Sequence, residues 1–158
     1  MKNFLIRQAV ESDLKTLLQF EQALIEAERP FDPTIRKGSL HYYDLKEFIV
    51  NKDAEVLVAV VDGQIVSSGY GIAKAARPYL DHKEYAYLGF MYTLPEYRGQ
   101  GINGKIIETL TTWARGRGLE EVRLTVYDDN APAIAAYEKV GFKKHIIEMR
   151  ILQTSQDS

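Results

Sequence analysis

The chain has 158 residues and no cysteine, and this absence excludes several kinds of site at once. Disulfides, thiol nucleophiles and zinc–thiolate centres all require cysteine. We therefore expect no covalent cysteine intermediate and no metal site.

Two further features are missing: an excess of charge of one sign and a long apolar run. The net charge is -2, and no run of like charges exceeds a few residues. A nucleic-acid-binding surface needs a basic face, so we expect no nucleic-acid partner. No stretch is long and apolar enough to span a bilayer, and the N-terminal apolar run is too short for a signal peptide. We therefore expect no membrane partner and a cytoplasmic location.

Hydrophobic residues make up 46% of the chain, so one packed domain over residues 1–158 is expected. Apolar periodicity and turn residues predict its elements. The expected strands are 4–8, 54–61, 65–75, 85–93, 122–127 and 142–151, and the expected helices are 11–28, 44–52, 102–116 and 131–140. Their order, β-α-α-β-β-β-α-β-α-β, predicts one mixed α/β sheet with helices on both faces. The polar segment 153–158 is expected to be a flexible tail.

Turns and loops add local predictions. Asp62-Gly63 is typical of a two-residue hairpin turn. Gly69 and Gly71, within an expected strand, predict a bulge or a close backbone approach. The aromatic segment 29–43 is either a lid packed on the core or a substrate-binding loop.

A glycine-rich turn joins the expected strand 85–93 to the expected helix 102–116. Glycines allow a ligand to approach the backbone closely, and the first turn of a helix carries unpaired N–H groups and a partial positive charge. The residues that would form the turn and its charged rim are Arg98, Gly99, Gln100, Gly101, Asn103, Gly104 and Lys105. The pattern favours a phosphate-binding cradle over an ordinary turn.

Two motifs make the chain resemble the GCN5-related N-acetyltransferase (GNAT) superfamily. Arg98-x-x-Gly101-x-Asn103 is similar to the pyrophosphate loop Arg/Gln-x-x-Gly-x-Gly/Ala of that family, with Asn103 in place of the usual Gly or Ala. A second segment, from Asn130 through Tyr137 to Gly141-Phe142, resembles the asparagine-to-Gly-Phe segment of the family. The resemblance covers nearly the whole chain, although residues 29–43 match only in their general role.

The resemblance implies an N-acetyltransferase that moves an acetyl group from acetyl-CoA to a primary amine of a small molecule or peptide. It implies that strands 85–93 and 122–127 splay apart to admit the pantetheine arm. Members are often dimers, so a homodimer is possible. The implied cofactor-binding residues are Met91, Tyr92, Thr93, Arg98, Gly99, Gln100, Gly101, Asn103, Gly104, Lys105, Asn130 and Tyr137. Without cysteine, direct attack of the amine in a ternary complex is the natural mechanism.

That reaction needs an acid for the leaving thiolate and a base for the amine. Tyr137 matches the acid of the family and shares a helix face with Asn130; the alternative is an aromatic core residue. No carboxylate lies on either face of the strand between Tyr85 and Met91, so we expect a water to relay the proton.

Strand alternation predicts which side chains hold that water and where the acceptor binds. The face expected to line the pocket is Tyr85, Tyr87, Gly89 and Met91, opposite Leu88 and Phe90. Tyr85 or Tyr87 would order the water, and Gly89 would leave open space for the acceptor. Glu28 and Asp32, beside Phe31, would favour a cationic acceptor at the pocket mouth; the alternative is a solvated helix end.

Two other functions fit parts of the sequence. The missing strand carboxylate is compatible with an acyl-CoA sensor that has lost catalysis. Gly99-x-Gly101-x-x-Gly104 fits the fingerprint of nicotinamide dinucleotide enzymes, with Asp128 after the next strand. Against this, residues 95–98 separate the strand from the glycines, where the fingerprint runs directly from the strand into the loop.

Overall fold

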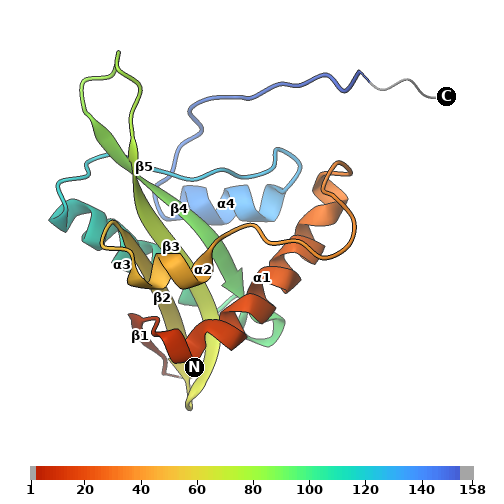
Figure 1. Cartoon of the computed structure of the whole chain (residues 1–158), viewed down its shortest axis with the longest axis vertical. Coiled ribbons are helices and arrows are strands. Elements are labelled where there is room, and N and C mark those ends of the chain that lie inside the picture. The colour runs from red at the N-terminus through yellow and green to blue at the C-terminus, as the bar shows by residue number, and fades with distance from the viewer. Residues whose placement is uncertain (1–2, 154–158) are drawn as a thin grey trace.

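The computed structural model describes residues 3–153 and shows one five-stranded sheet (Figure 1). Its strands are β1 (Leu5–Gln8), β2 (Ala54–Val61), β3 (Gln64–Ala75), β4 (Glu84–Thr93) and β5 (Val122–Arg123). They lie in the order β1-β2-β3-β4-β5, with antiparallel pairing up to β4 and parallel pairing of β4 with β5. This confirms the mixed α/β sheet. A single parallel pair among the described strands does not provide the parallel sheet that a nicotinamide-binding fold requires.

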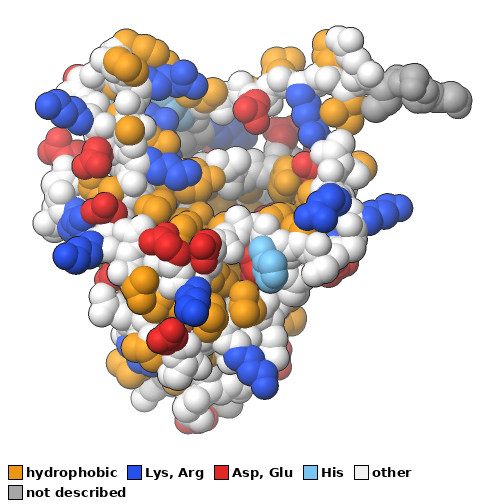
Figure 2. Space-filling view, viewed as in Figure 1, with side chains coloured by type: hydrophobic (Ala, Val, Ile, Leu, Met, Phe, Trp, Pro, Cys, Tyr) orange, Lys and Arg blue, Asp and Glu red, His pale blue; other side chains and the backbone are white. Residues whose placement is uncertain are grey.

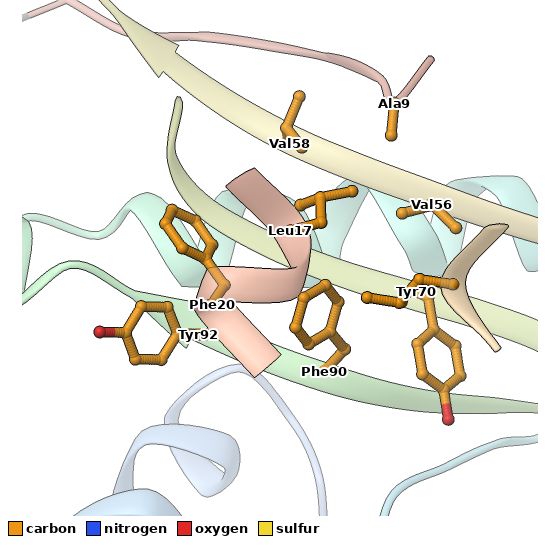
Figure 3. Packing of buried hydrophobic residues seen from close by; sticks show 9 residues of the cluster. Ala9, Leu17, Phe20, Val56, Val58, Tyr70, Phe90 and Tyr92 are labelled. Atoms are coloured by element: carbon orange, nitrogen blue, oxygen red, sulfur yellow. The ribbon is translucent and has the colours of Figure 1, made fainter. Parts of the chain in front are cut away.

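Helices cover both faces of the sheet because β2 is apolar on both sides. On one face, α1 (Leu14–Glu28) and α2 (Leu45–Val50) pack on Val56 and Val58. Figure 3 shows this cluster, in which Leu17 and Phe20 of α1 lie against Phe90 and Tyr92. On the other face, α3 (Ile102–Gly116) packs on the opposite side of β2, and α4 (Ala131–Lys139) adds Tyr137 at its margin. None of the described helices is both long and apolar enough to cross a bilayer.

The glycines of the hairpin and of β3 behave as predicted. Asp62 and Gly63 adopt positive φ angles of 49° and 79°, which suit the turn between β2 and β3. A Cβ atom on Gly69 would lie 2.8 Å from both Ile106 Cγ2 and Met91 Sδ. The close approach of α3 to β3 therefore requires a residue without a side chain at this position.

A bulge in β4 changes the predicted alternation of its side chains. The register shifts between Ser68 and Tyr70, and Phe90 on β4 takes a φ of 59°. Two residues of β4 oppose one residue of β3 at a bulge, so the alternation inverts there. Phe90 consequently packs on the α1 side together with Tyr87, and Met91 packs on the α3 side. The predicted common face of Tyr87 and Met91 is wrong for this reason.

The predicted last strand is also wrong in the structure. Residues 140–153 contain no helix or strand, and the segment projects from the end of α4 (Figure 1). A strand forms only against a partner edge, and this segment pairs with none of the described strands. The predicted strand 122–127 is likewise reduced to the two residues of β5. Most of the expected tail, residues 154–158, lies outside the described residues.

Candidate active site

The glycine-rich turn forms an open cradle at the start of α3. Gly99 and Gly101 adopt left-handed φ angles of 78° and 79°, and Gly101 occupies the N-cap of the helix. A Cβ atom on either glycine would meet nothing within 4 Å, so the space in front of the helix is free. Backbone conformation, and not crowding, is what favours glycine here. The free first-turn N–H groups of α3 face this space and suit an anionic group such as a diphosphate.

The side chains around the cradle differ in what they can offer a ligand. Arg98 is exposed, and its Nε donates to the Thr93 carbonyl at 2.9 Å. Lys105 is exposed and forms an ion pair with Glu108 at 3.2 Å. These two cations lie at the rim.

Asn103 and Gln100 make contacts within the protein. The Asn103 side chain turns inward, with its Nδ2 3.9 Å from Met91 Sδ, and Gln100 Nε2 donates to the Glu96 carbonyl at 3.4 Å. The asparagine that departs from the family pattern therefore leaves the cradle open.

Beside the cradle, β4 loses its neighbour. β4 and β5 pair only through Ala86 with Val122 and Tyr87 with Arg123. Beyond this point the β5-facing edge of β4, including Met91 to Thr93, has no strand partner among residues 3–153. An unpaired edge can accept an extended chain that carries amide groups. The strands thus separate next to the anion cradle, as expected for a pantetheine-binding cleft.

Tyr137 lies on α4 and, like Met91 of β4, packs against the apolar cluster beneath α3. Asn130 begins this helix, and its Oδ1 accepts a hydrogen bond from the Ala133 N–H at 3.3 Å. Tyr137 is half-buried, and its ring meets that of Phe142 edge-on at 6.1 Å. Burial raises the pKa of the Tyr137 hydroxyl, and the nearby Glu28 carboxylate raises it further. The hydroxyl is therefore protonated at neutral pH, as a proton donor must be.

Glu28, at the end of α1, is the carboxylate that the structure brings close to Tyr137. It is half-buried and has no ion-pair partner among the described residues, and burial raises its pKa above the ordinary range. Its charge also adds to burial in raising the pKa values of Tyr42, Tyr43 and Tyr127. The buried Tyr42 hydroxyl offsets part of this rise in the pKa of Glu28, although it makes no hydrogen bond of normal geometry to a described residue. A half-buried carboxylate that lies among tyrosines, without an ion-pair partner among the described residues, is suited to bind a cation.

Asp32 is held differently from Glu28. Its Oδ1 accepts from the Thr34 N–H at 3.0 Å and from Arg150 Nη2 at 2.8 Å, and its Oδ2 lies 3.4 Å from the Tyr127 hydroxyl. Hydrogen bonds from Thr34 and then from Arg150 hold the pKa of Asp32 well below its usual range. Phe31 stacks on Tyr127 at 5.9 Å. The charge of Asp32 is thus compensated by an ion pair with Arg150, whereas Glu28 has no ion-pair partner among the described residues.

Sequence reasoning missed a fully buried carboxylate, Glu21. Its Oε2 accepts from the N–H groups of Tyr42 and Tyr43 at 2.8 and 2.9 Å, and its Oε1 lies 2.7 Å from His41 Nδ1. Glu21 therefore fixes the aromatic loop over the end of α1. Its position on the apolar stripe of that helix, between Leu17 and Ile25, was the signal that could have found it.

The predicted pocket face on β4 is only partly assembled. Tyr85 precedes the two β4 residues that pair with β5, and the Arg123 guanidinium lies 4.1 Å from its ring centre, so it is not brought to the cleft. Tyr87 lies at the splay, and its hydroxyl donates to Thr125 Oγ1 at 2.8 Å. The expected open space at Gly89 is absent, because a Cβ there would lie 2.7 Å from the Tyr70 hydroxyl. Tyr70 faces Gly89 across the sheet and fills the gap.

Comparison with known proteins agrees with this geometry. The model of the Acetyltransferase (GNAT) family matches residues 20–142. The chain is 33% identical over 149 residues to a thialysine N-epsilon-acetyltransferase of Sus scrofa, covering 89% of this chain and 85% of that protein. The corresponding protein of Mus musculus is 31% identical over 144 residues, with coverage of 86% and 82%.

A solved structure of a predicted acetyltransferase with acetyl-CoA, from Clostridium acetobutylicum, superimposes with a TM-score of 0.70. It is 20% identical and covers 98% of this chain and 100% of the other, which shows a shared fold.

Proposed function

Because the chain belongs to the acetyltransferase (GNAT) family, and is therefore an N-acetyltransferase that uses acetyl-CoA, we propose that it acetylates the terminal amine of a small amino-acid-like acceptor. The amine attacks the acetyl group directly within a ternary complex. The observation that carries this proposal is the half-buried Glu28 carboxylate, which lacks an ion-pair partner in the described chain and whose charge raises the pKa of Tyr137. The similarity to thialysine N-epsilon-acetyltransferases supports an acceptor with an amine at the end of its side chain.

The chain's own groups are suited to hold the donor. Bound acetyl-CoA supplies an acetyl group activated as a thioester. The open cradle at Gly99 and Gly101 fits its diphosphate, with Arg98 and Lys105 adding charge at the rim. The unpaired edge of β4 from Met91 to Thr93 is suited to the amide groups of the pantetheine arm.

We assign the proton donor to Tyr137, which would protonate the leaving sulfur. We expect Tyr137→Phe to lower kcat about 10²-fold, the low end for a positioned proton donor. The phenylalanine ring keeps the contact with Phe142, so acetyl-CoA affinity and Tm should change little. Steady-state rates combined with calorimetry separate the two effects. An unchanged kcat, under conditions where chemistry limits the rate, would leave Tyr137 with a packing role only.

We assign the proton acceptor to Glu28, acting directly or through one water. We do not retain the water relay predicted through Tyr85 or Tyr87. Tyr85 lies outside the region where β4 and β5 separate, and the Tyr87 hydroxyl already donates a hydrogen bond to Thr125 Oγ1. The carboxylate would first bind the cationic amine and then take its proton. The raised pKa of Glu28 brings it closer to neutral pH, where a general base is most effective.

A panel of acceptors assayed with acetyl-CoA and thiol detection tests the acceptor class. We expect the highest kcat/KM for thialysine and for similar amino acids with a terminal side-chain amine. Amino sugars carrying phosphate should be poor acceptors, because the pocket presents a carboxylate without a compensating cation. Preference for an anionic acceptor, or for a peptide N-terminus over every small amine, would refute the proposed substrate class.

A further inference from the structure

Glu21 is a buried carboxylate to which the proposed reaction assigns no role. Its side chain is fully buried on the apolar stripe of α1, between Leu17 and Ile25. Burial of a charged group costs free energy, and an apolar residue of similar volume in place of a buried ionic group is often neutral or stabilising. Stability alone therefore does not account for a glutamate at this position.

The Glu21 side chain is bonded to one short piece of the loop between α1 and α2. Its Oε2 accepts the N–H groups of Tyr42 and Tyr43, and its Oε1 lies 2.7 Å from His41 Nδ1. Residues 32–44 contain no helix or strand. Contacts of this kind, and not a regular element, therefore set where the two tyrosines lie.

The same loop is tied to α1 and its end at further points. Gln22 Nε2 donates to the Leu40 carbonyl at 2.9 Å, and Arg29 Nη1 donates to the Arg36 carbonyl at 3.0 Å. The loop runs from the end of α1 across one face of the molecule to α2 (Figure 1). Figure 2 shows this face hollowed beside the loop, with apolar side chains lining the hollow. The loop is thus fixed along its length where it borders the hollow.

Tyr43 anchors this piece of the loop in the core. Its ring meets that of Tyr70 edge-on at 5.2 Å and lies 5.4 Å from the ring of Phe90, at the bulge of β4. The Tyr42 ring in turn meets the Tyr43 ring edge-on at 5.7 Å. The position of Tyr42 therefore depends on both the backbone contact with Glu21 and the packing of its neighbour.

The Tyr42 hydroxyl lies at the acceptor site. Burial raises the pKa of Glu28, and the nearby Tyr42 hydroxyl offsets part of that rise. The hydroxyl oxygen is itself buried, yet it makes no hydrogen bond of normal geometry to a described residue. Buried polar groups in proteins are almost always hydrogen-bonded, so unused capacity of this kind suits a ligand.

We propose that the Tyr42 hydroxyl binds the acceptor amine together with Glu28, and that Glu21 is the positioning residue that holds Tyr42 in place. An alkylammonium group carries several N–H donors, so it can donate to a carboxylate and to a phenolic oxygen at once. Glu21 touches no reacting atom, so its effect passes through the loop. The inference rests on the proposed function, because it adds a second group to the acceptor site built on Glu28.

Tyr42→Phe removes the hydroxyl and keeps the ring. We expect the KM for thialysine to rise about tenfold, as for the loss of a hydrogen bond to a charged group, with little change in kcat or in acetyl-CoA affinity. The phenylalanine ring keeps the contact with Tyr43, so the loop should stay in place. Steady-state rates with thialysine varied at saturating acetyl-CoA give both constants. An unchanged KM for thialysine would overturn the proposal.

Glu21→Leu tests the positioning role. Leucine fits the apolar stripe of α1 but leaves the N–H groups of Tyr42 and Tyr43 without their acceptor, so the loop should leave its place. The KM for thialysine should rise at least as much as in Tyr42→Phe. Glu21→Gln keeps an oxygen that can accept both N–H groups, so it should restore most of the lost affinity.

A double variant separates positioning from general weakening of the fold. If Glu21 acts through Tyr42, adding Tyr42→Phe to Glu21→Leu should raise KM no further. Asp13→Leu is the matched control, because Asp13 is also a buried carboxylate that accepts a backbone N–H, at the other end of α1. The control should lower Tm but leave the KM for thialysine unchanged. Effects that multiply in the double variant, or an equal rise of KM in Asp13→Leu, would leave Glu21 a structural role only and overturn the proposal.

The proposed function and this inference fail in different measurements. Near-normal activity in Glu28→Gln would contradict the proposed function. An unchanged KM in Tyr42→Phe, in a protein that Glu28→Gln inactivates, would contradict this inference alone. If the acceptor panel selects an amine other than thialysine, the KM values are measured for that amine.

Discussion

Gly101→Glu is expected to abolish the binding of both coenzyme A and acetyl-CoA. Gly101 has a φ of 79° and precedes the first turn of α3, with open space where a side chain would project. A glutamate there pays about 1–2 kcal/mol for the left-handed conformation and places a carboxylate where the diphosphate would bind. In the unmodified protein, each ligand should raise Tm through mass action, and in the variant neither should.

Gly118→Glu is the matched control for this change. Gly118 also has a left-handed φ, 74°, and open space around it, but it follows the other end of α3. The control carries the same backbone strain and the same added charge, so it should retain full coenzyme affinity. Calorimetry on both variants distinguishes loss of the cradle from loss of the fold. Full affinity in Gly101→Glu, or tight binding of NADH with none of acetyl-CoA, would contradict the assignment of the cradle.

Glu28→Gln is expected to lower kcat/KM about 10³-fold, within the range for loss of a positioned general base. The amide keeps the size of the side chain but can neither attract the ammonium group nor take its proton. Acetyl-CoA affinity should be unchanged, because the cradle lies on α3 and Glu28 lies on α1. Glu26→Gln, two residues earlier and paired only with Arg29 at the surface, is the control and should keep near-normal activity. Near-normal activity in Glu28→Gln would exclude a direct role for this carboxylate.

The pH dependence gives a second readout for Glu28. The base must be ionised, so the acid limb of kcat/KM should lie above pH 4.3, about the ordinary value for glutamate, and should vanish in Glu28→Gln. Between the unfolded and the raised folded pKa, the native state binds more protons than the unfolded state. The free energy of unfolding therefore falls as pH rises through that window. Replacing Glu28 by glutamine removes this loss, so the variant should be at least as stable as the original at neutral pH.

Local sequence signals predicted the cradle and most of the fold. Gly99 and Gly101 adopt left-handed φ angles that favour glycine, so their residue type alone indicates the turn. The apolar run of β2 indicates burial on both faces. These features depend on residue type and on residues close together in the chain, so they can be predicted from a single sequence.

The features that the sequence did not predict depend on long-range contacts. The bulge at Phe90 is supported by hydroxyl groups from another strand: Ser68 Oγ donates to the Phe90 carbonyl at 3.1 Å. Tyr70 fills the space at Gly89 only because the two residues face each other across the sheet. Residues 142–151 show the opposite case, since their sequence predicts a strand, yet they pair with no strand of the described chain.

One time course tests the proposed activity most directly: purified protein is incubated with acetyl-CoA and thialysine, and free thiol and acetylated amine are quantified together. We expect one thiol released for each acetylated molecule, with the acetyl group on the side-chain amine and no acetyl group retained on the protein. Firm binding of acetyl-CoA without thiol release, with thialysine and with every other amine tested, would contradict the activity and identify the protein as a non-catalytic acyl-CoA-binding protein.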